Sequence, residues 1–217
     1  MKVPSFEFLL DIFYPPSCFF CKNFLKKRSI LCDRCSDHIN PIVSTTVNVT
    51  KKYSVKVFSI SDYKDPIRSL ILSKGSSDIV SSRKLGDLIW DRTNINNVDF
   101  DFIVPIPLHW TRFARRGFNQ AEEMARTISQ RSNKKLITIL SRTKKTKRQS
   151  ELSPENRFEN VKNVFKLNVK DISEYKNKNL LIVDDLMTTG STIKAAARAL
   201  IYLKPLSISA VVASRVV

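Results

Sequence analysis

The sequence has little glycine and no long uncharged apolar run. Only four glycines occur in 217 residues, so Gly117 and Gly190, both in expected loops, draw attention as sites of special backbone conformation. The most apolar stretch near the start, residues 6–20, is interrupted by Glu7, Asp11, Pro15 and Pro16. It lacks the roughly 20 apolar residues of a membrane span and the layout of a signal peptide. We therefore expect no membrane span and a cytoplasmic location.

The apolar residues of this first stretch recur at helical spacing: Phe6, Leu9, Leu10 and Phe13. This spacing predicts a short amphipathic helix that packs on its own protein. A helix lying on a membrane surface is the alternative.

Acidic residues are scarce beside basic ones. The chain has 37 Lys and Arg against 20 Asp and Glu, a formal charge of +17, which favours a polyanionic partner. The excess is concentrated in residues 110–149, where basic side chains could release counterions from a nucleic-acid backbone. A solvated basic face without a partner is the alternative. The residues we expect to bind nucleic acid are Arg112, Arg115, Arg116, Arg142, Lys144, Lys145, Lys147 and Arg148.

All the cysteines lie in one segment, as two C-x-x-C pairs: Cys18 with Cys21, and Cys32 with Cys35. Each pair can point two thiolates at one tetrahedral ion, so the two pairs predict a closed Cys₄ zinc site without an open coordination position. Such a site is structural. Two disulfides are the alternative, which a reducing compartment disfavours.

Strand-like and helix-like segments alternate after residue 53, which predicts an α/β fold with a mostly parallel sheet flanked by helices. We expect a zinc-binding module with a short amphipathic helix in residues 1–50, and the α/β domain in residues 51–217. The Thr/Val/Lys-rich stretch through Lys52 is expected to connect them. We expect strands at residues 55–60, 102–107, 136–140, 179–183 and 208–213. We expect one helix with Asp65 as its cap and Pro66 as its first residue, a second that includes residues 85–90, a third that begins at Asn119 with a capping box, and a fourth at residues 191–203.

Two adjacent carboxylates, Asp184 and Asp185, directly follow the apolar strand expected at 179–183. In an open parallel sheet, ligands bind beyond the carboxyl ends of the strands, where this pair can accept hydrogen bonds from ribose hydroxyls. A hydroxyl-rich turn into a helix comes next, and its backbone N–H groups suit an anion. The turn consists of Thr188, Thr189, Gly190, Ser191 and Thr192. A capped turn without a ligand is the alternative.

This string resembles the 5-phosphoribosyl 1-diphosphate (PRPP) motif of type I phosphoribosyltransferases. The resemblance implies a type I phosphoribosyltransferase-like fold, with Asp184 and Asp185 on the ribose hydroxyls and Thr188 to Thr192 on the 5-phosphate. Magnesium would enter with the pyrophosphate of the ligand, since Mg²⁺ is held by one or two carboxylates together with phosphate oxygens.

A second set of motifs resembles the ComF family of competence proteins, including its GntX-like members. These motifs are Val104–His109, Arg115–Gln120, Arg142-Thr143 with Gln149, Leu152, Arg157, Asn160 and Phe165, an upstream set of Tyr63, Pro66, Arg68, Leu72 and Lys74, and the Cys₄ module itself. The resemblance implies a pyrophosphate loop at Val104–His109 and an arm that offers donors to phosphate oxygens. The loop and arm residues are Pro107, His109, Arg112, Arg115, Arg116, Gly117, Asn119 and Gln120.

The resemblance implies a role in natural transformation, on single-stranded DNA taken up into the cytoplasm. Our leading hypothesis is single-stranded DNA binding by the stretch Arg112 to Arg148, in a protein that retains a PRPP pocket. Aromatic residues for base stacking, Trp110, Phe113 and Phe118, alternate with its arginines. One alternative is an active phosphoribosyltransferase that uses PRPP and Mg²⁺ in nucleotide metabolism. Another is an adaptor whose zinc module docks on the helicase-like ATPase of DNA uptake.

Overall fold

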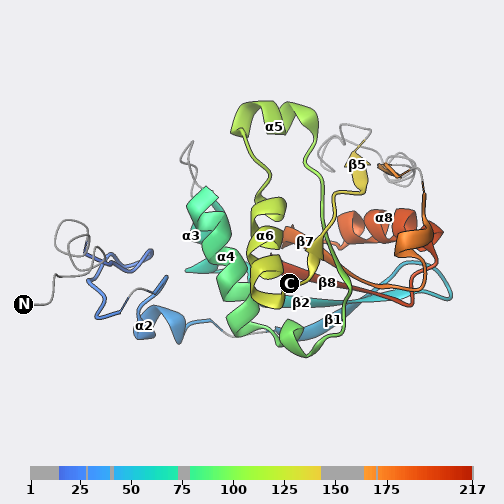
Figure 1. Ribbon diagram of the computed structural model, residues 1–217. Coiled ribbons are helices and arrows are strands. Elements are labelled where there is room, and N and C mark those ends of the chain that lie inside the picture. Colours follow the sequence, from blue (N-terminus) through green and yellow to red (C-terminus); the bar gives the residue numbers. More distant parts are fainter. Residues whose placement is uncertain are drawn as a thin grey trace, which may run out of the picture.

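The computed structural model describes residues 15–27, 29–39, 42–72, 79–142, 164–169 and 171–216. It shows an α/β domain around one twisted sheet and, at the N-terminal side, a small cysteine-bearing module (Figure 1). The amphipathic helix expected at residues 6–13 lies outside the described residues. So do Lys144, Lys145, Lys147 and Arg148, with the matched positions Lys74, Gln149, Leu152, Arg157 and Asn160.

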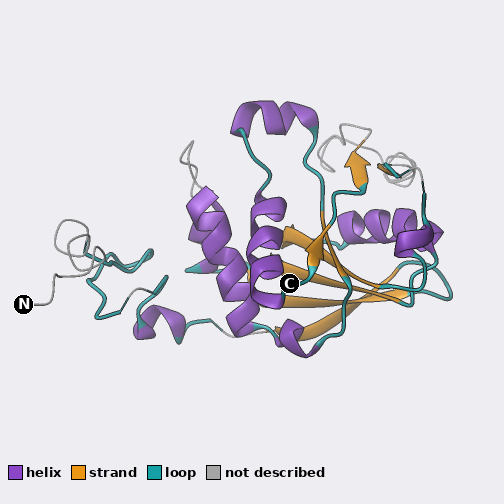
Figure 2. Ribbon diagram, in the orientation of Figure 1, coloured by secondary structure: helices purple, strands orange, loops and turns teal. Residues whose placement is uncertain are grey.

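A six-stranded sheet forms the centre of the domain (Figure 2). Its strands run in the spatial order β1-β2-β8-β7-β3-β4. Only the edge strand β1 is antiparallel to its neighbour, so the expected mostly parallel sheet is confirmed. The strands are β1 Ile42–Asn48, β2 Ser54–Asp62, β3 Phe102–Pro105, β4 Lys135–Leu136, β7 Asn179–Met187 and β8 Ser207–Arg215.

Helices cover both faces of this sheet. The connections from β2 to β3 and from β3 to β4 cross the sheet in one direction, whereas the connection from β7 to β8 runs back. Because such crossovers are right-handed, the two directions place their helices on opposite faces. One face carries α3 (Ile67–Leu72), α4 (Ile79–Arg92) and α6 (Gln120–Ser132), and the other carries α8 (Ser191–Leu200).

The remaining elements are short. The module contributes α2 (Asp33–Ser36), and α5 (Trp110–Arg116) stands above the sheet between β3 and α6. A separate antiparallel pair is formed by β5 (Leu140–Arg142) and β6 (Phe165–Leu167). In the part of the chain that the structure describes, 3₁₀ turns span Asn94–Asn97, Ser173–Tyr175 and Ile201–Leu203.

The core centres on β7. Its residues Leu180 to Val183 are almost fully buried, because β3 and β8 flank the strand and helices cover both faces. A strand buried on both faces has a continuous apolar run, as here. On α8, the small side chains of Ala195, Ala196 and Ala197 are all buried.

The stretch through Lys52, which we expected to connect two domains, contains a strand of the main sheet. Residues 42–48 form β1, which pairs with β2 as a hairpin in the main sheet. The β-branched residues of this stretch suit an edge strand. A boundary at residue 50 would divide the hairpin, so the topology favours a start of the α/β domain at Ile42.

Several expected element boundaries also differ from the structure. The strand expected at 136–140 is two strands in two sheets, because the chain leaves the main sheet after Leu136. The strand expected at 179–183 continues to Met187 alongside β8, so both aspartates lie within it. The helix after Asp65 begins at Ile67, one residue beyond the expected start, and the Asp65 carboxylate caps it by accepting the Ser69 N–H.

The capping box expected at Asn119 is not formed. Asn119 does precede α6 as its N-cap residue, but its side chain makes no capping hydrogen bond. Instead its amide donates to the carbonyl of Ile106 over 3.0 Å. The Asn119 side chain therefore bonds to a distant segment of the chain instead of capping its own helix.

Among the described residues, no helix is both long enough and apolar enough to cross a bilayer.

Candidate functional site

The two predicted ligand-binding segments meet between β3 and β7. Crossovers leave these neighbouring strands in opposite directions, which creates a crevice at their carboxyl ends where α/β proteins bind ligands. Pro105 is the register partner of Val183, and the Ile106 N–H donates to the Val183 carbonyl over 2.9 Å. The predicted pyrophosphate loop therefore starts beside Asp184 and Asp185.

The adjacent carboxylates differ in their surroundings. Asp184 is only 8% exposed, and its Oδ1 accepts the Asp185 backbone N–H over 2.9 Å, whereas Asp185 is half-buried. Burial raises the pKa of Asp184 well above its ordinary value, and the nearby charge of Asp185 adds to the rise. A buried carboxyl that gives up its proton reluctantly is suited to donate to or accept from a ligand hydroxyl.

The turn after β7 contains the residues that we predicted to form an anion cradle. Thr188 and Thr189 are exposed, Ser191 and Thr192 are half-buried, and Gly190 is the N-cap of α8. Gly190 has a φ of 72°, and a Cβ there would lie 2.9 Å from Cγ2 of Val47 on β1. Only glycine meets both conditions without strain. The sequence predicted this turn, but the part played by Val47 was missed.

The loop after β3 ends in a histidine that starts a helix. His109 is buried and is the N-cap of α5; its Nδ1 lies 2.8 Å from the Thr111 hydroxyl and accepts the Thr111 N–H over 3.3 Å. Gly117 ends α5 with a φ of 79°. His109 thus has a structural role in fixing the loop, and its predicted contact with pyrophosphate stays a prediction.

Residues of the predicted arm form hydrogen bonds within the domain. Arg116 is half-buried and donates to the Gln120 side chain over 2.8 Å, and Asn119 anchors the arm to Ile106. Arg112 is exposed on α5. The Arg115 side chain lies outside the described part of the structure.

Arg142, which we predicted to bind nucleic acid, lies close to the aspartate site, and its contact with nucleic acid stays a prediction. It is half-buried at the end of β5, with its guanidinium carbon 5.7 Å from the centre of the Phe165 ring. Burial lowers its pKa and the nearby Arg112 lowers it further, whereas Asp184 acts in the opposite direction. The charges of Arg142, Arg112 and Asp184 are therefore close enough to affect one another.

A cavity of about 170 Å³ adjoins the predicted pyrophosphate loop. Its lining includes Leu108, Phe113, Thr138 and Leu140. Leu108 belongs to the predicted pyrophosphate loop, whereas sequence reasoning missed Thr138 and Leu140. Only their position next to the ends of expected strands could have pointed to them.

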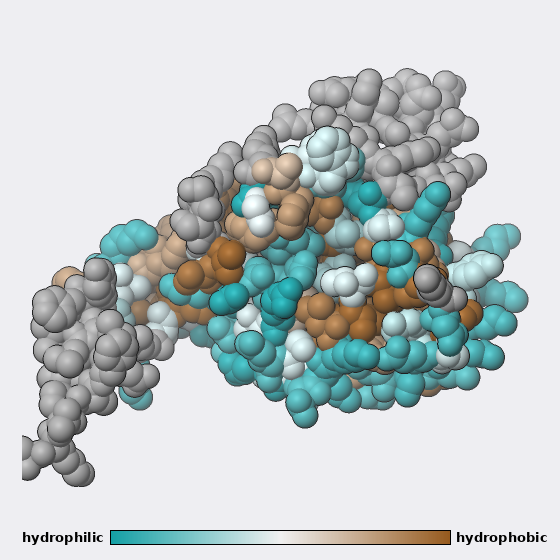
Figure 3. All heavy atoms as spheres, turned by 45° about the horizontal axis from the view of Figure 1, so that its top comes forward, coloured by the Kyte–Doolittle hydropathy of each residue, from teal (hydrophilic) through white to brown (hydrophobic). Residues whose placement is uncertain are grey.

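Two aromatic residues of α5 lie on the surface. Trp110 is 71% exposed and Phe113 is 49% exposed, with the exposed Arg112 between them in sequence. Apolar residues reach the surface in the part of the molecule that carries α5, among hydrophilic neighbours (Figure 3).

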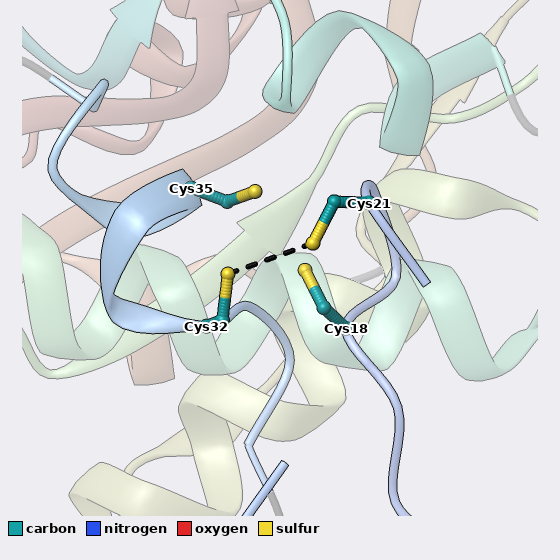
Figure 4. A group of neighbouring side chains, drawn as sticks. All are labelled: Cys18, Cys21, Cys32 and Cys35. Atoms are coloured by element: carbon teal, nitrogen blue, oxygen red, sulfur yellow. Dashed lines mark hydrogen bonds between the residues drawn. The ribbon is translucent and has the colours of Figure 1, made fainter. Parts of the chain in front are cut away.

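The four cysteine side chains converge on one point (Figure 4). Their sulfur atoms all lie within 4.8 Å of one another, and Sγ of Cys21 is 3.6 Å from Sγ of Cys32. Tetrahedral ligands with Zn–S bonds of about 2.3 Å would be about 3.8 Å apart, so the cysteines fit a structural zinc ion. All four are free thiols, and the disulfide alternative is wrong.

The match to known protein families covers both parts of the chain. The phosphoribosyl transferase domain matches residues 84–215, and the double zinc ribbon domain matches residues 9–47. These matches confirm the expected fold class and, with the thiol geometry, the expected zinc module.

Several known proteins are similar to parts of the chain. It is 37% identical over 99 residues to Competence protein F of Haemophilus influenzae, which covers 45% of this chain and 43% of the relative. It is 30% identical over 153 residues to the DNA utilization protein YhgH of Escherichia coli K12, covering 67% and 66%. Identity to Competence protein ComFC of Bacillus subtilis is 27% over 145 residues, covering 67% and 56%. The matches thus span less than two thirds of the length of each of these relatives.

Proposed function

Because this chain belongs to the ComF family and carries a phosphoribosyltransferase-like domain, we propose that it binds single-stranded DNA in the cytoplasm during DNA uptake in natural transformation. In this proposal the crevice between β3 and β7 holds PRPP or a related phosphoribosyl ligand. The names of its relatives, competence protein and DNA utilization protein, support a role in DNA handling.

The observation that carries the DNA-binding proposal is the exposed face of α5. Trp110 and Phe113 offer two aromatic rings to solvent, with Arg112 beside them. Proteins that bind single strands combine stacking rings, worth about 1–3 kcal/mol per base, with cations along the backbone. An unpaired strand exposes its bases for such stacking, whereas a duplex does not. This helix therefore favours a single strand over a duplex.

The phosphoribosyl part of the proposal rests on the pair of aspartates and the cradle. Asp184 and Asp185 would accept hydrogen bonds from the ribose hydroxyls, and the Thr188–Thr192 turn would bind the 5-phosphate through hydroxyls and backbone N–H groups. Mg²⁺ binds oxygen ligands and keeps phosphate oxygens in its shell, and adjacent carboxylates at this edge suit it. When bound, the ion would neutralise the charge of the pyrophosphate.

The two proposed sites share one segment of chain. The Ile106 backbone bonds to Val183 on the aspartate side through its N–H and to Asn119 on the α5 side through its carbonyl. A ligand that orders the loop after β3 would therefore also restrict the position of both ends of α5. We propose that the phosphoribosyl ligand acts on DNA binding through this segment.

Binding of a labelled single strand with and without PRPP and Mg²⁺ tests the proposal. We expect fluorescence anisotropy to show binding that weakens steeply with salt, and a change in DNA affinity when PRPP and Mg²⁺ are added. Absence of binding to both DNA and PRPP would reject the proposal. An unchanged DNA affinity beside clear PRPP binding would reject the link between the sites.

One observation favours a second function, an active phosphoribosyltransferase. The cavity of about 170 Å³ beside Leu108 and Phe113 opens next to the predicted pyrophosphate loop, where an acceptor base would be held. In such an enzyme, positioning and stabilisation of developing charge would supply most of the rate. Pyrophosphate release across a panel of bases, abolished by Asp184→Asn, would support this function, and no release with any base would count against it.

A further inference from the structure

The zinc module exposes aromatic side chains that neither the fold nor the zinc site uses. Phe24 is 77% exposed and Phe20 is 41% exposed. Both lie on the first knuckle hairpin, residues 17–25, which carries Cys18 and Cys21. A phenylalanine as exposed as Phe24 removes little apolar surface from water, so this residue contributes little to the stability of the module.

The hairpin geometry explains why these rings point outward. Ser17 and Phe24 form an antiparallel bridge, and the Cys18 N–H donates to the Asn23 carbonyl over 2.8 Å. Neighbouring residues of such a strand point to opposite sides: Leu25 packs against the core cluster, and Phe24 faces away from it. On the other arm the chain turns at residues 19–21, so this alternation does not apply there: Cys18 is buried, Phe19 packs against the core, and Phe20 is exposed.

The same hairpin is basic. Lys22, Lys26 and Lys27 are all exposed, and residues 15–27 contain no Asp or Glu. The ammonium group of Lys22 lies 4.8 Å from the centre of the Phe19 ring. Exposed aromatic rings set among exposed cations, without acidic residues, form the combination that binds an unpaired polyanionic strand.

We propose that this hairpin, residues 17–25 with Lys26 and Lys27, is a second contact for single-stranded nucleic acid. Bases stack on Phe20 and Phe24, and the lysines contact phosphates. This inference rests on the proposed function, since it adds a second contact to the one on α5. A strand held at two points binds more tightly than at either alone, provided that it is long enough to span both.

The charge favours a nucleic acid over a protein partner on this surface. Protein–protein interfaces are depleted of lysine at their centres, whereas here lysines flank both rings. A strand backbone, in contrast, gains from each cation by releasing counterions. The module is also anchored to the domain, because Arg92 of α4 donates to the Ser36 hydroxyl next to Cys35, so the hairpin has a fixed base from which to bind.

The test is the double variant Phe20→Ala/Phe24→Ala, measured in the full chain with zinc content and thermal midpoint checked first. The probe is a labelled single strand of about 20 nucleotides, longer than the roughly 4–16 that one compact binding fold covers. We expect the affinity to fall at least about fivefold, since stacking is worth about 1–3 kcal/mol per base. Tyr202→Ala is the matched control, because Tyr202 is an aromatic residue 76% exposed on the 3₁₀ turn after α8.

An abasic strand of the same length separates stacking from charge. The double variant should bind it as tightly as the wild-type protein does, because no base is present to stack. An equal loss of affinity for the abasic strand would overturn the inference. Unchanged affinity of the double variant for the base-bearing strand would also overturn the inference. If the thermal midpoint were lowered or the sedimentation altered at the same time, the rings would be covered by another part of this chain or by another protein copy.

The outcome is distinguishable from failure of the proposed function. If the wild-type protein binds no single strand, both are wrong. If Phe20→Ala/Phe24→Ala weakens binding and Trp110→Ala/Phe113→Ala does not, the hairpin is the DNA contact and α5 is not. If the wild-type protein binds and only the α5 variant is weakened, this inference alone is wrong.

Discussion

The backbone N–H of Ile106 donates to the carbonyl of Val183 over 2.9 Å, and this bond joins the two motifs that form the proposed site. Val183 immediately precedes Asp184, and Ile106 precedes the loop that runs to His109. The aspartates and the predicted pyrophosphate loop are far apart in sequence, yet they lie next to each other at the carboxyl edge of the sheet.

Gly190→Ala should destabilise the protein and weaken phosphoribosyl binding. The new Cβ would be held at positive φ, about 1–2 kcal/mol for an ordinary residue, and would collide with Val47. Gly117→Ala is the matched control, since it has the same backbone strain but no atom within 4 Å of its Cβ. Urea unfolding should show a larger loss of stability at Gly190, partly restored by Val47→Ala. Equal losses at both glycines would contradict the close contact with β1.

Asp184→Asn should change how stability depends on pH in the ligand-free protein. Because its folded pKa is raised, the folded state binds the proton more tightly than the unfolded chain does. That stabilisation is complete below the unfolded pKa of about 4 and is lost as pH rises through the folded pKa. The variant, which does not titrate, should therefore gain in free energy of unfolding relative to wild type as the pH rises from about 4 through the folded pKa. A difference that stays constant with pH would show that Asp184 titrates normally.

Many residues of the proposed sites could be predicted from the sequence, because they are adjacent along the chain. Asp184, Asp185 and the hydroxyl-rich turn are adjacent along the chain, and each C-x-x-C pair fixes half of a zinc site locally. The fold class followed from the alternation of apolar segments and from the family resemblance.

What the sequence did not reveal depends on contacts between distant segments. Asn119 looked like a capping-box residue, but the carbonyl of Ile106 competes for its side chain. Arg142 looked like one more surface cation, because a strand of three residues has no readable burial pattern and its partner Phe165 is far along the chain. The strand β1 was missed since edge-strand propensity is weak and depends on its neighbour.

Arg112→Ala should make DNA binding less dependent on salt. The affinity for DNA at high salt should change little. Removing one cation from a phosphate should flatten the slope of log K against log salt by about 0.7 for a single strand. Arg142→Ala provides the comparison: as a half-buried residue near Asp184 it should leave that slope nearly unchanged. Anisotropy titrations over roughly 50 to 300 mM salt measure both slopes. The reverse result would place Arg142, and not Arg112, on the DNA.

Cys32→Ser should release zinc and unfold the module alone. A closed site needs all of its thiolates, and metal binding is coupled to the folding of such a module. Metal analysis should find about one zinc per wild-type chain and less in the variant. Hydrogen exchange should lose protection in the module while amides of β7 and β8 keep theirs, because those two strands are buried at the centre of the main sheet. Loss of protection in β7 as well would show that the domain depends on the zinc site.

The most direct test of single-stranded DNA binding is the affinity of Trp110→Ala/Phe113→Ala for a labelled single strand, beside wild type and the Tyr202→Ala control. Loss of two exposed stacking rings should weaken binding at least about fivefold, with the salt slope retained because Arg112 is intact. Zinc content and thermal midpoint should be measured beside the affinity, since Trp110 is 71% exposed but Phe113 is about half-buried and lines the cavity beside Leu108. An affinity equal to that of the wild-type protein would contradict the claim that α5 is the single-stranded DNA platform of this protein.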